Sequence, residues 1–212
     1  AAGPGVSTGE LDTLAEGMIR AAGGVPAFKG YRGYPATLCT SVNDVIVHGI
    51  PNGKTRLREG DLLSVDCGVL LEGYYGDAAV TFGVGAVSAE AQRLVAVTRA
   101  CLDEAVATVA PDARLGDVGA AVQRRAEAAG FGVVREFVGH GIGRALHEEP
   151  QVPNYGKPGQ GQRLMPGLVI AIEPMITGGS WRVVIDDDGW TARTEDGKLA
   201  AHFECSVAVT AD

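Results

Sequence analysis

Acidic residues lie inside segments that otherwise have the pattern of buried β-strands, and this feature most constrains the fold. Asp66 stands within a run of Leu and Val residues, Glu173 ends a similar apolar run, and Glu204 lies in a third strand-like segment. A buried carboxylate must be paired with a positive group or bound to a metal, because its desolvation is otherwise too costly. The fold must therefore provide these carboxylates with such a partner.

A β-hairpin is predicted around the turn residues Glu72-Gly73, between the β-rich segments 61–71 and 74–83. Asp66 and Asp77 are almost equidistant from this turn, so we expect them to be near cross-strand neighbours on one face. Two like charges placed so closely repel each other unless a cation lies between them. For the hairpin alone, the alternative is one exposed Asp and one Asp bonded to the turn.

Three helices are predicted, over 7–22, 89–109 and 116–129. The first begins at Ser7, which forms a capping-box pattern with Glu10, and it carries apolar residues at three- and four-residue steps. We expect segment 38–50 to be rich in β-structure and 131–212 to consist mostly of strands and turns. This order of elements predicts an α+β fold.

A weak internal repeat appears when the sequence is shifted by 107 residues. The matched pairs are Pro4 with Pro111, Gly9 with Gly116, Arg56-Leu57 with Arg163-Leu164, Gly60 with Gly167, and Asp66 with Glu173. Chance matching would explain any single pair, but it is a poorer explanation of several pairs in the same order. We interpret the chain as two related α+β halves, near 1–109 and 110–212, with a site at their interface.

Composition excludes several classes of protein. The 212 residues carry a net charge of −8, which argues against binding to a nucleic-acid backbone as the main task. No uncharged apolar run is long enough to cross a membrane. The four cysteines form no C-x-x-C pair, so we expect reduced thiols in a cytoplasmic protein. The sequence does not begin with Met, and we expect the natural N-terminus to lie upstream.

A glycine-rich segment from 139 to 150 contains two histidines, His140 and His147. Two histidines in such a bend favour a functional site, and we expect the flanking glycines to let a ligand approach the ring. One histidine and four carboxylates form a set of hard ligands that suits two divalent ions, and hydrolysis is the reaction they support. The set consists of Asp66, Asp77, His140, Glu173 and Glu204.

These residues resemble the metal ligands of the type I methionine aminopeptidases of bacterial kind. The resemblance includes the motifs His48-Gly-Ile-Pro51, His147-Glu-Glu-Pro150 and Ile172-Glu-Pro-Met175, and it covers essentially all of residues 4–210. The ligand spacings of 11, 63, 33 and 31 residues are compact, as in that type. Aminopeptidase P, prolidase and creatinase share this motif set, but His48-Gly-Ile-Pro51, Ile172-Glu-Pro-Met175 and the lack of a large N-terminal domain favour the methionine enzymes.

The resemblance implies the pita-bread fold, in which two pseudo-twofold-related α+β halves share an antiparallel sheet within a single catalytic domain, here 1–212. It implies two divalent ions, of cobalt, manganese, iron or zinc. Asp66 and Asp77 would hold one ion, and His140 and Glu173 the other, with Asp77 and Glu204 bridging them. A monovalent cation near Asn43 and Val45 is a further implication. The family's usual helix before Pro4 is missing from this sequence.

The resemblance also implies the roles of individual side chains. Glu173 would shuttle the proton, His147 would stabilise the tetrahedral oxyanion or contact the next peptide unit, and His48 would hydrogen-bond the scissile amide nitrogen. Apolar and aromatic residues would line the pocket for the methionine side chain, as a thioether requires. These residues are Phe28, Tyr31, Tyr34, Cys39, Leu146 and Trp190.

The activity implied is removal of the initiator methionine from nascent chains whose second residue is small. The partners would be nascent polypeptide N-termini and the ribosome, without nucleic-acid or membrane binding, and the enzyme would be a monomer. Leu146 stands where relatives frequently carry Phe, which implies a wider pocket, and Cys205-Ser206 replaces His-Thr. A prolidase or aminopeptidase P, and a catalytically silent binding module of the same fold, are the alternatives.

Overall fold

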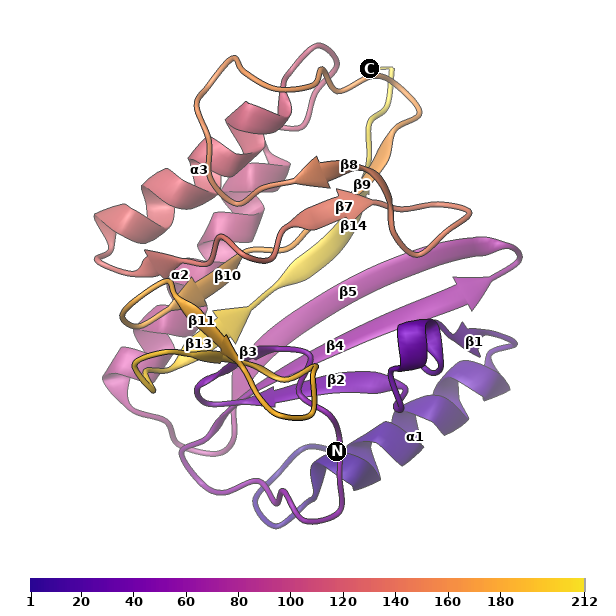
Figure 1. Cartoon of the computed structure of the whole chain (residues 1–212), viewed down its shortest axis with the longest axis vertical. Helices are drawn as coiled ribbons and strands as arrows, with labels where there is room; N and C mark the ends of the chain where they lie inside the picture. Colours follow the sequence, from indigo (N-terminus) through magenta and orange to yellow (C-terminus); the bar gives the residue numbers. More distant parts are fainter. Residues whose placement is uncertain (212) are drawn as a thin grey trace.

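Eight strands form one antiparallel sheet in the computed structural model, which describes residues 1–211. The strand order is β1-β4-β5-β14-β9-β7-β8, and β2 pairs with β4 on the same edge as β1. The strands are β1 (Val25–Pro26), β2 (Leu38–Val42), β4 (Leu62–Leu71), β5 (Tyr74–Gly83), β7 (Gly139–Gly141), β8 (Glu148–Val152), β9 (Val169–Ile172) and β14 (Glu204–Ala208). The C-terminal strand β14 therefore lies at the centre of the sheet (Figure 1).

Two three-stranded sheets accompany the large one. The first has the order β13 (Ala200–His202), β10 (Met175–Thr177), β6 (Gly132–Val133), and the second has the order β11 (Val183–Ile185), β12 (Ala192–Thr194), β3 (Val45–Val47). In both small sheets a strand from residues before 134 pairs with strands from residues after 174. The second sheet thereby fixes the segment that precedes His48 against the C-terminal part of the chain.

Helices α2 (Ala89–Val106) and α3 (Leu115–Ala128) pack against each other and against the sheet, as Figure 1 shows. Their apolar residues recur at three- and four-residue steps and form the main hydrophobic core with β9 and β10, in which Leu94, Val122 and Ile170 are fully buried. Helix α1 (Thr8–Ala21) packs against β1 and β2. The predicted helices are confirmed with small shifts at their ends, and so is the α+β class.

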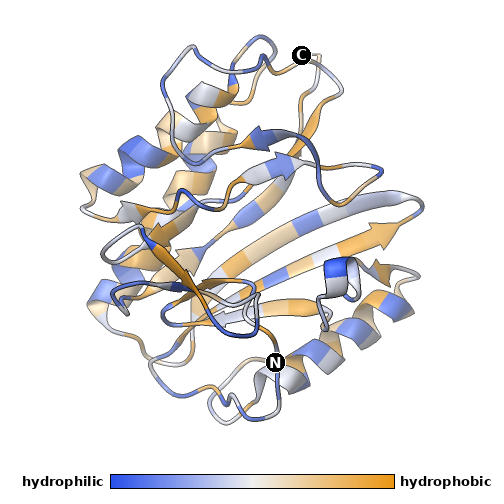
Figure 2. Cartoon of the chain, in the orientation of Figure 1, coloured by the Kyte–Doolittle hydropathy of each residue, from blue (hydrophilic) through white to orange (hydrophobic). Residues whose placement is uncertain are grey.

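Polar and apolar residues are distributed as expected for such a layered fold. In Figure 2 the helices carry blue patches beside apolar ones, while long stretches of the sheet are orange. No helix among residues 1–211 has the length and apolar character needed to cross a membrane.

The predicted hairpin is formed by β4 and β5, and its register refines the expectation for the two aspartates. Asp66 lies opposite Ala79, and Asp77 lies opposite Gly68. Asp66 and Asp77 are therefore diagonal neighbours two positions apart, on the same face of the sheet. The turn at Glu72-Gly73 uses two residues with positive φ, 51° and 84°. The difference from direct opposition arises because the turn is centred one residue later than the midpoint of the aspartates.

The internal repeat has a counterpart in backbone hydrogen bonds. Gly5 N–H donates to the carbonyl of Leu57 at 2.8 Å, and 107 residues later Asp112 N–H donates to that of Leu164 at 3.1 Å. Isolated β-bridges recur at the same offset, Ser7 with Arg56 and Arg114 with Arg163. The same backbone anchor thus precedes α1 and α3, which supports the prediction of two related halves.

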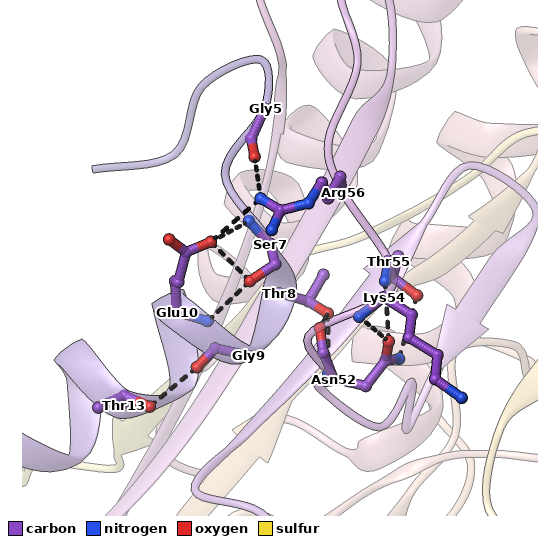
Figure 3. A network of polar contacts seen from close by, with 10 residues as sticks. All are labelled: Gly5, Ser7, Thr8, Gly9, Glu10, Thr13, Asn52, Lys54, Thr55 and Arg56. Carbon is purple, nitrogen blue, oxygen red and sulfur yellow. Dashed lines mark hydrogen bonds and ion pairs between the residues drawn. The ribbon is translucent and has the colours of Figure 1, made fainter.

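The start of α1 shows how this anchor is held (Figure 3). Ser7 Oγ accepts from Glu10 N–H at 3.2 Å, while the Glu10 carboxylate accepts from Ser7 N–H at 2.8 Å. In the second half, Asp117 takes the place of Glu10 and accepts from Arg114 N–H at 2.8 Å. Both carboxylates satisfy an otherwise unpaired N–H group at a helix start.

Candidate metal centre and substrate cavity

Four carboxylates converge where the central strands of the large sheet meet. Asp66 and Glu204 both lie opposite Ala79, from the two sides of β5, and Asp77 is two positions along the same strand. Glu173 directly follows β9, and the register of β9 with β14, continued by one position, places it opposite Glu204. Strand pairing alone therefore brings carboxylates from four strands to one face.

His140 completes the group from β7, which pairs with β9. One ligand atom each from Asp77, His140 and Glu204 lie within 4.8 Å of one another. His140 Nε2 is 3.8 Å from Glu173 Oε1. All three residues of the 4.8 Å group are buried, so the group is enclosed by protein rather than spread over the surface.

The electrostatics of this cluster favour a bound cation. Among the described residues, Asp66 Oδ1, Asp77 Oδ1 and Glu204 Oε1 are buried oxygens without a hydrogen-bond partner. Burial raises the pKa of Asp77 to about 7, and burial together with the neighbouring carboxylates raises the pKa of Asp66 and Glu204 well above the usual range. Oxygen-rich sites with one imidazole suit divalent metal ions. The residues present therefore fit a divalent metal centre.

His140 is oriented as a metal ligand should be. Its Nδ1 lies 2.8 Å from the carbonyl of Gly141, which fixes the tautomer with Nδ1–H donating and leaves the Nε2 lone pair facing the carboxylates. Burial lowers the pKa of the ring and keeps it neutral. Side chains at Gly139 and Gly141 would collide with the carbonyls of Ala171 and Glu149. The lack of a side chain at these glycines therefore allows neighbouring segments to approach closely. The sequence had suggested that they make room for a ligand instead.

His202 was missed as a site residue in the sequence. It is 2% exposed, and its Nε2, which has no hydrogen-bond partner among the described residues, lies 3.8 Å from Glu173 Oε2 and 3.9 Å from Glu204 Oε2. Burial lowers its pKa to about 3, so it is neutral beside the cluster. Its position two residues before Glu204 was the available signal, because alternate residues of an extended segment share a face.

A cavity of about 310 Å³ opens next to the carboxylates. It is lined by all thirteen residues that the sequence proposed for the metals, the catalysis and the methionine pocket: Phe28, Tyr31, Tyr34, Cys39, His48, Asp66, Asp77, His140, Leu146, His147, Glu173, Trp190 and Glu204. The sequence did not predict the other lining residues, which are Arg32, Val47, Glu136, Phe137 and Val138. Apolar and ionisable groups therefore face a common space.

Two further histidines stand at this cavity. The His147 ring stacks on Tyr31 with centroids 5.2 Å apart and lies 4.2 Å from the ring of His140. Partial desolvation, then the charges of neighbouring groups, lowers the pKa of His147 to about 4. His48 has a φ of 60° and packs edge-on against Phe137 at 5.2 Å, and burial lowers its pKa. Both rings are neutral at pH 7, so each has one donor and one acceptor nitrogen.

The apolar end of the cavity is built mainly from the segment before β2 and from β2 itself. Phe28, Tyr34, Cys39 and Leu146 are buried together, and Trp190 packs against this group. The hydroxyl of Tyr34 donates to the carbonyl of Leu38 at 2.9 Å, and its ring meets Trp190 edge-on at 5.1 Å. Because the Tyr34 hydroxyl is already bonded to backbone, this part of the pocket offers an apolar, aromatic lining to a ligand.

Ser206, one of the departures from the resemblance, supports Asp77. Its Oγ accepts from Asp77 N–H at 3.0 Å and donates to the Asp77 carbonyl at 3.0 Å. Its neighbour Cys205 packs against the main core instead. The hydroxyl thus holds the backbone of a candidate ligand in place.

Asn43 and Val45 lie outside this cavity and border a separate cleft of about 490 Å³. The Asn43 side chain donates to Asp61 and accepts from Leu62 N–H, both at 2.9 Å. The backbone carbonyl of Asn43 accepts from Ala200 N–H at 2.8 Å. The monovalent cation near Asn43 and Val45 stays a prediction.

Comparison with known proteins agrees with this geometry. The model of metallopeptidase family M24 matches residues 1–211. Methionine aminopeptidase of Clostridium perfringens is 52% identical over 206 residues, which are 97% of this chain and 82% of that protein. Methionine aminopeptidase 1 of Bacillus subtilis is 47% identical, over 98% of this chain and 83% of that protein.

Solved structures extend the comparison. The methionine aminopeptidase of Thermotoga maritima superposes with a TM-score of 0.96 at 48% identity, over 98% of this chain and 83% of that one. The prolidase of Pyrococcus furiosus, at 21% identity and a TM-score of 0.75, shares the fold over 98% of this chain and 54% of that one. The predicted pita-bread fold is thereby confirmed. The chain belongs to metallopeptidase family M24 and, within it, to the methionine aminopeptidases.

Proposed function

We propose that this protein removes the N-terminal methionine from peptides and nascent proteins whose second residue is small. The observation that carries the proposal is the pair of neighbouring regions in one cavity, a cluster of buried carboxylates with unpaired oxygens and an apolar pocket of aromatic residues and a thiol. The first region suits metal-assisted hydrolysis, and the second suits a thioether side chain.

Two divalent ions are the proposed cofactors, of cobalt, manganese, iron or zinc. Asp66 and Asp77 would hold one, and His140 and Glu173 would hold the other, with Asp77 and Glu204 shared between the two. The proposal is supported by the three unpaired oxygens and by the fixed tautomer of His140. When bound, such ions polarise a peptide carbonyl and activate water for attack near neutral pH.

The protein's own side chains move the protons and hold the substrate. Glu173 takes a proton from the attacking water and returns it to the leaving amine, since its carboxylate lies on the cavity wall beside the other candidate ligands. His147 donates to the oxyanion through its single N–H, and its stacking on Tyr31 holds the ring in place. His48 hydrogen-bonds the scissile amide nitrogen. The position of each group on the cavity wall supports these roles.

Selectivity follows from the volume available at each substrate position. The methionine side chain enters the pocket of Phe28, Tyr31, Tyr34, Cys39, Leu146 and Trp190. The second side chain must pass between the metals and the rings of His48 and His147, where only a small residue leaves the carbonyl in reach. A larger residue at that position therefore loses the reactive geometry and reduces kcat/KM.

Several further features belong to the same proposal. The enzyme acts in the cytoplasm as a monomer on nascent N-termini close to the ribosome, and it binds a monovalent cation near Asn43 and Val45. Residues 1–212 form a single catalytic domain whose halves meet near residues 109 and 110. The recurring hydrogen bonds ahead of α1 and α3 support this division.

The decisive experiment compares hydrolysis of Met-Ala-Ser with that of X-Pro peptides. The protein is first treated with a chelator, and each divalent metal is then added back separately. We expect cleavage of Met-Ala-Ser alone, dependent on added metal. Preference for X-Pro peptides would favour a prolidase-like activity, and metal-independent or absent cleavage of both would overturn the proposal.

A further inference from the structure

Two charged side chains line the cavity apart from the five candidate metal ligands and the histidines. They are Arg32 and Glu136, both exposed. Arg32 lies in the short helical turn η1 (Tyr31–Gly33), where it adopts the left-handed conformation with a φ of 49°. Among the described residues it forms no ion pair within 4 Å, so its guanidinium is available to a ligand at the cavity mouth.

A row of stacked groups connects Arg32 with the metal centre. The guanidinium carbon of Arg32 lies 5.3 Å from the centroid of the Tyr31 ring. Tyr31 stacks on His147 at 5.2 Å, and His147 lies 4.2 Å from His140. The charge of Arg32 also contributes to the lowered pKa of His147, whereas that of Glu136 is not among its causes. Arg32 is thus the fixed charge that acts on the His147 side of the cavity.

A substrate chain that leaves the metal centre along this wall of the cavity passes the row. Its first side chain occupies the apolar pocket and its second lies beside the metals, so the third is the first with freedom to reach outward. An extended peptide advances ~3.3 Å per residue. Two further residues therefore carry the chain past His147 toward the guanidinium, whose forked donors match a carboxylate.

We propose that Arg32 is a specificity-determining residue that binds an acidic side chain at the third or fourth position of the substrate. This inference rests on the proposed function and deepens it by assigning a charge preference beyond the first two residues. The contact is solvent-exposed, so its effect is modest and sensitive to salt.

The test uses C-terminally amidated pentapeptides, because a free carboxylate in a short peptide would itself occupy Arg32. Met-Ala peptides carry Asp, Asn or Lys at the third or the fourth position, and kcat/KM is measured for each. At low salt we expect Asp to exceed Asn by about two- to fivefold at one of these positions, the range typical of exposed ion pairs. Lys should fall below Asn, and 0.5 M salt should reduce both differences.

Variants of Arg32 test whether this side chain causes the preference for an acidic residue. Arg32→Asn removes the charge with a residue that tolerates positive φ, and it should abolish the preference. Arg32→Lys should keep it, and Arg32→Glu should reverse it. Arg144→Asn is the matched control, since Arg144 lies 5.3 Å over the exposed ring of Tyr74 and does not line the cavity. It should leave the preference unchanged.

The uncharged Asn peptide measures the proposed function independently of this inference. If that peptide is cleaved but Asp and Lys peptides are cleaved equally at both positions, the inference is wrong while the proposed function stands. Retention of the preference in Arg32→Asn, or its loss in Arg144→Asn, would likewise overturn the assignment to Arg32.

Discussion

The two halves of the molecule share a backbone frame but supply different chemistry. In each, a segment before a helix bonds to a later segment at matched positions, and a strand then brings a carboxylate to the centre, Asp66 in one half and Glu173 in the other. The first half adds most of the apolar pocket, with Tyr34 and Cys39. The second half adds His140 among the groups that face the metals.

The loops after the two His-x-x-Pro motifs also differ. After His48, Asn52 closes a tight turn by accepting from the N–H groups of Lys54 and Thr55 at 2.9 and 2.8 Å (Figure 3). After His147 the chain forms β8 and a longer loop, which is tied to α3 by the N–H of Gly159 on Asp117 at 2.7 Å. The repeated hydrogen bonds fix the frame, so the loops and side chains are free to diverge.

The largest effect should come from the residue that joins the halves at the metal centre. Glu204→Gln removes a bridging charge and should lower kcat by more than about 100-fold, beyond the range found for outer partners of a metal site. Metal content, measured on the same sample, should fall. Asp77→Asn should behave alike, and full activity in both variants would contradict the dinuclear assignment.

Metal removal should destabilise both halves together. The unpaired buried carboxylates repel one another without a cation, and a ligand at 1,000 times its Kd contributes ~4 kcal/mol. Chelation should therefore lower the Tm by about 10 °C. In Glu204→Gln the shift should be smaller, because one buried charge is gone. Hydrogen exchange that rises in β4 but not in β9 would show that the halves are coupled less tightly than we expect.

The ring centroids of His140 and His147 lie 4.2 Å apart, but we expect substitution of each histidine to have a different effect. His147→Ala should lower kcat by about 100-fold, the cost of losing an oxyanion donor, with metal content unchanged. His140→Ala should instead lower the metal content of the protein. A His147 variant that loses metal, yet has normal kcat in excess metal, would assign that ring to the metal instead.

Leu146 tests the contribution of the second half to the apolar pocket. Leu146→Phe narrows the pocket and should increase discrimination between methionine and leucine at the first position by up to about tenfold, since one methylene is worth ~1–3 kcal/mol. The measurement is kcat/KM on peptides that vary only at the first residue. Unchanged discrimination would mean that Leu146 does not define the pocket wall.

Substitutions of the carboxylates at the starts of α1 and α3 should have the smallest effects. Because these carboxylates hold matched positions, their substitution allows a direct comparison of the two halves. Asp117 accepts hydrogen bonds from the N–H groups of two segments, at Arg114 and Gly159, whereas Glu10 binds Ser7 and, at 3.7 Å, Arg56. Asp117→Asn should therefore lower the Tm more than Glu10→Gln does.

The pH dependence of these variants has a defined sign. The hydrogen bonds hold the pKa of the Asp117 carboxyl below its ordinary value of 3.8 and that of the Glu10 carboxyl below its ordinary value of 4.5. Their stabilisation is present above the unfolded pKa and is lost as the pH falls through the folded value. The Tm differences between variants and wild type should therefore be full at pH 7 and shrink below pH 4. Differences that persist in strong acid would exclude these ionic contacts as the cause.

Local signals in the sequence predicted much of the fold. The capping box of Ser7 and Glu10 located the start of the first helix, and Glu72-Gly73 located the hairpin turn. The carboxylates could be found because a charge in an apolar strand is costly wherever the strand lies. These features depend on neighbours along the chain.

Features that depend on distant pairing could not be predicted in this way. The strand order places β14 between β5 and β9, and its pairing with β5 joins Glu204 to Ala79, which lies more than a hundred residues earlier in the chain. His202 escaped notice because its role requires knowing that β13 and β9 bring it beside Glu173. Arg32 escaped notice for the same reason, since only the folded chain places η1 at the cavity mouth.

The central position of β14 has a consequence for how the protein is made. A chain emerging N-terminal end first has produced every other strand of the large sheet before β14, and the edges of β5 and β9 are unpaired until that strand arrives. Closing such long-range contacts is slow, and it comes last in synthesis. A chain interrupted before residue 204 lacks both the strand that joins the sheet and a carboxylate of its cluster. Peptidase activity therefore cannot precede the synthesis of β14, and chains that end before it leave the edges of β5 and β9 unpaired.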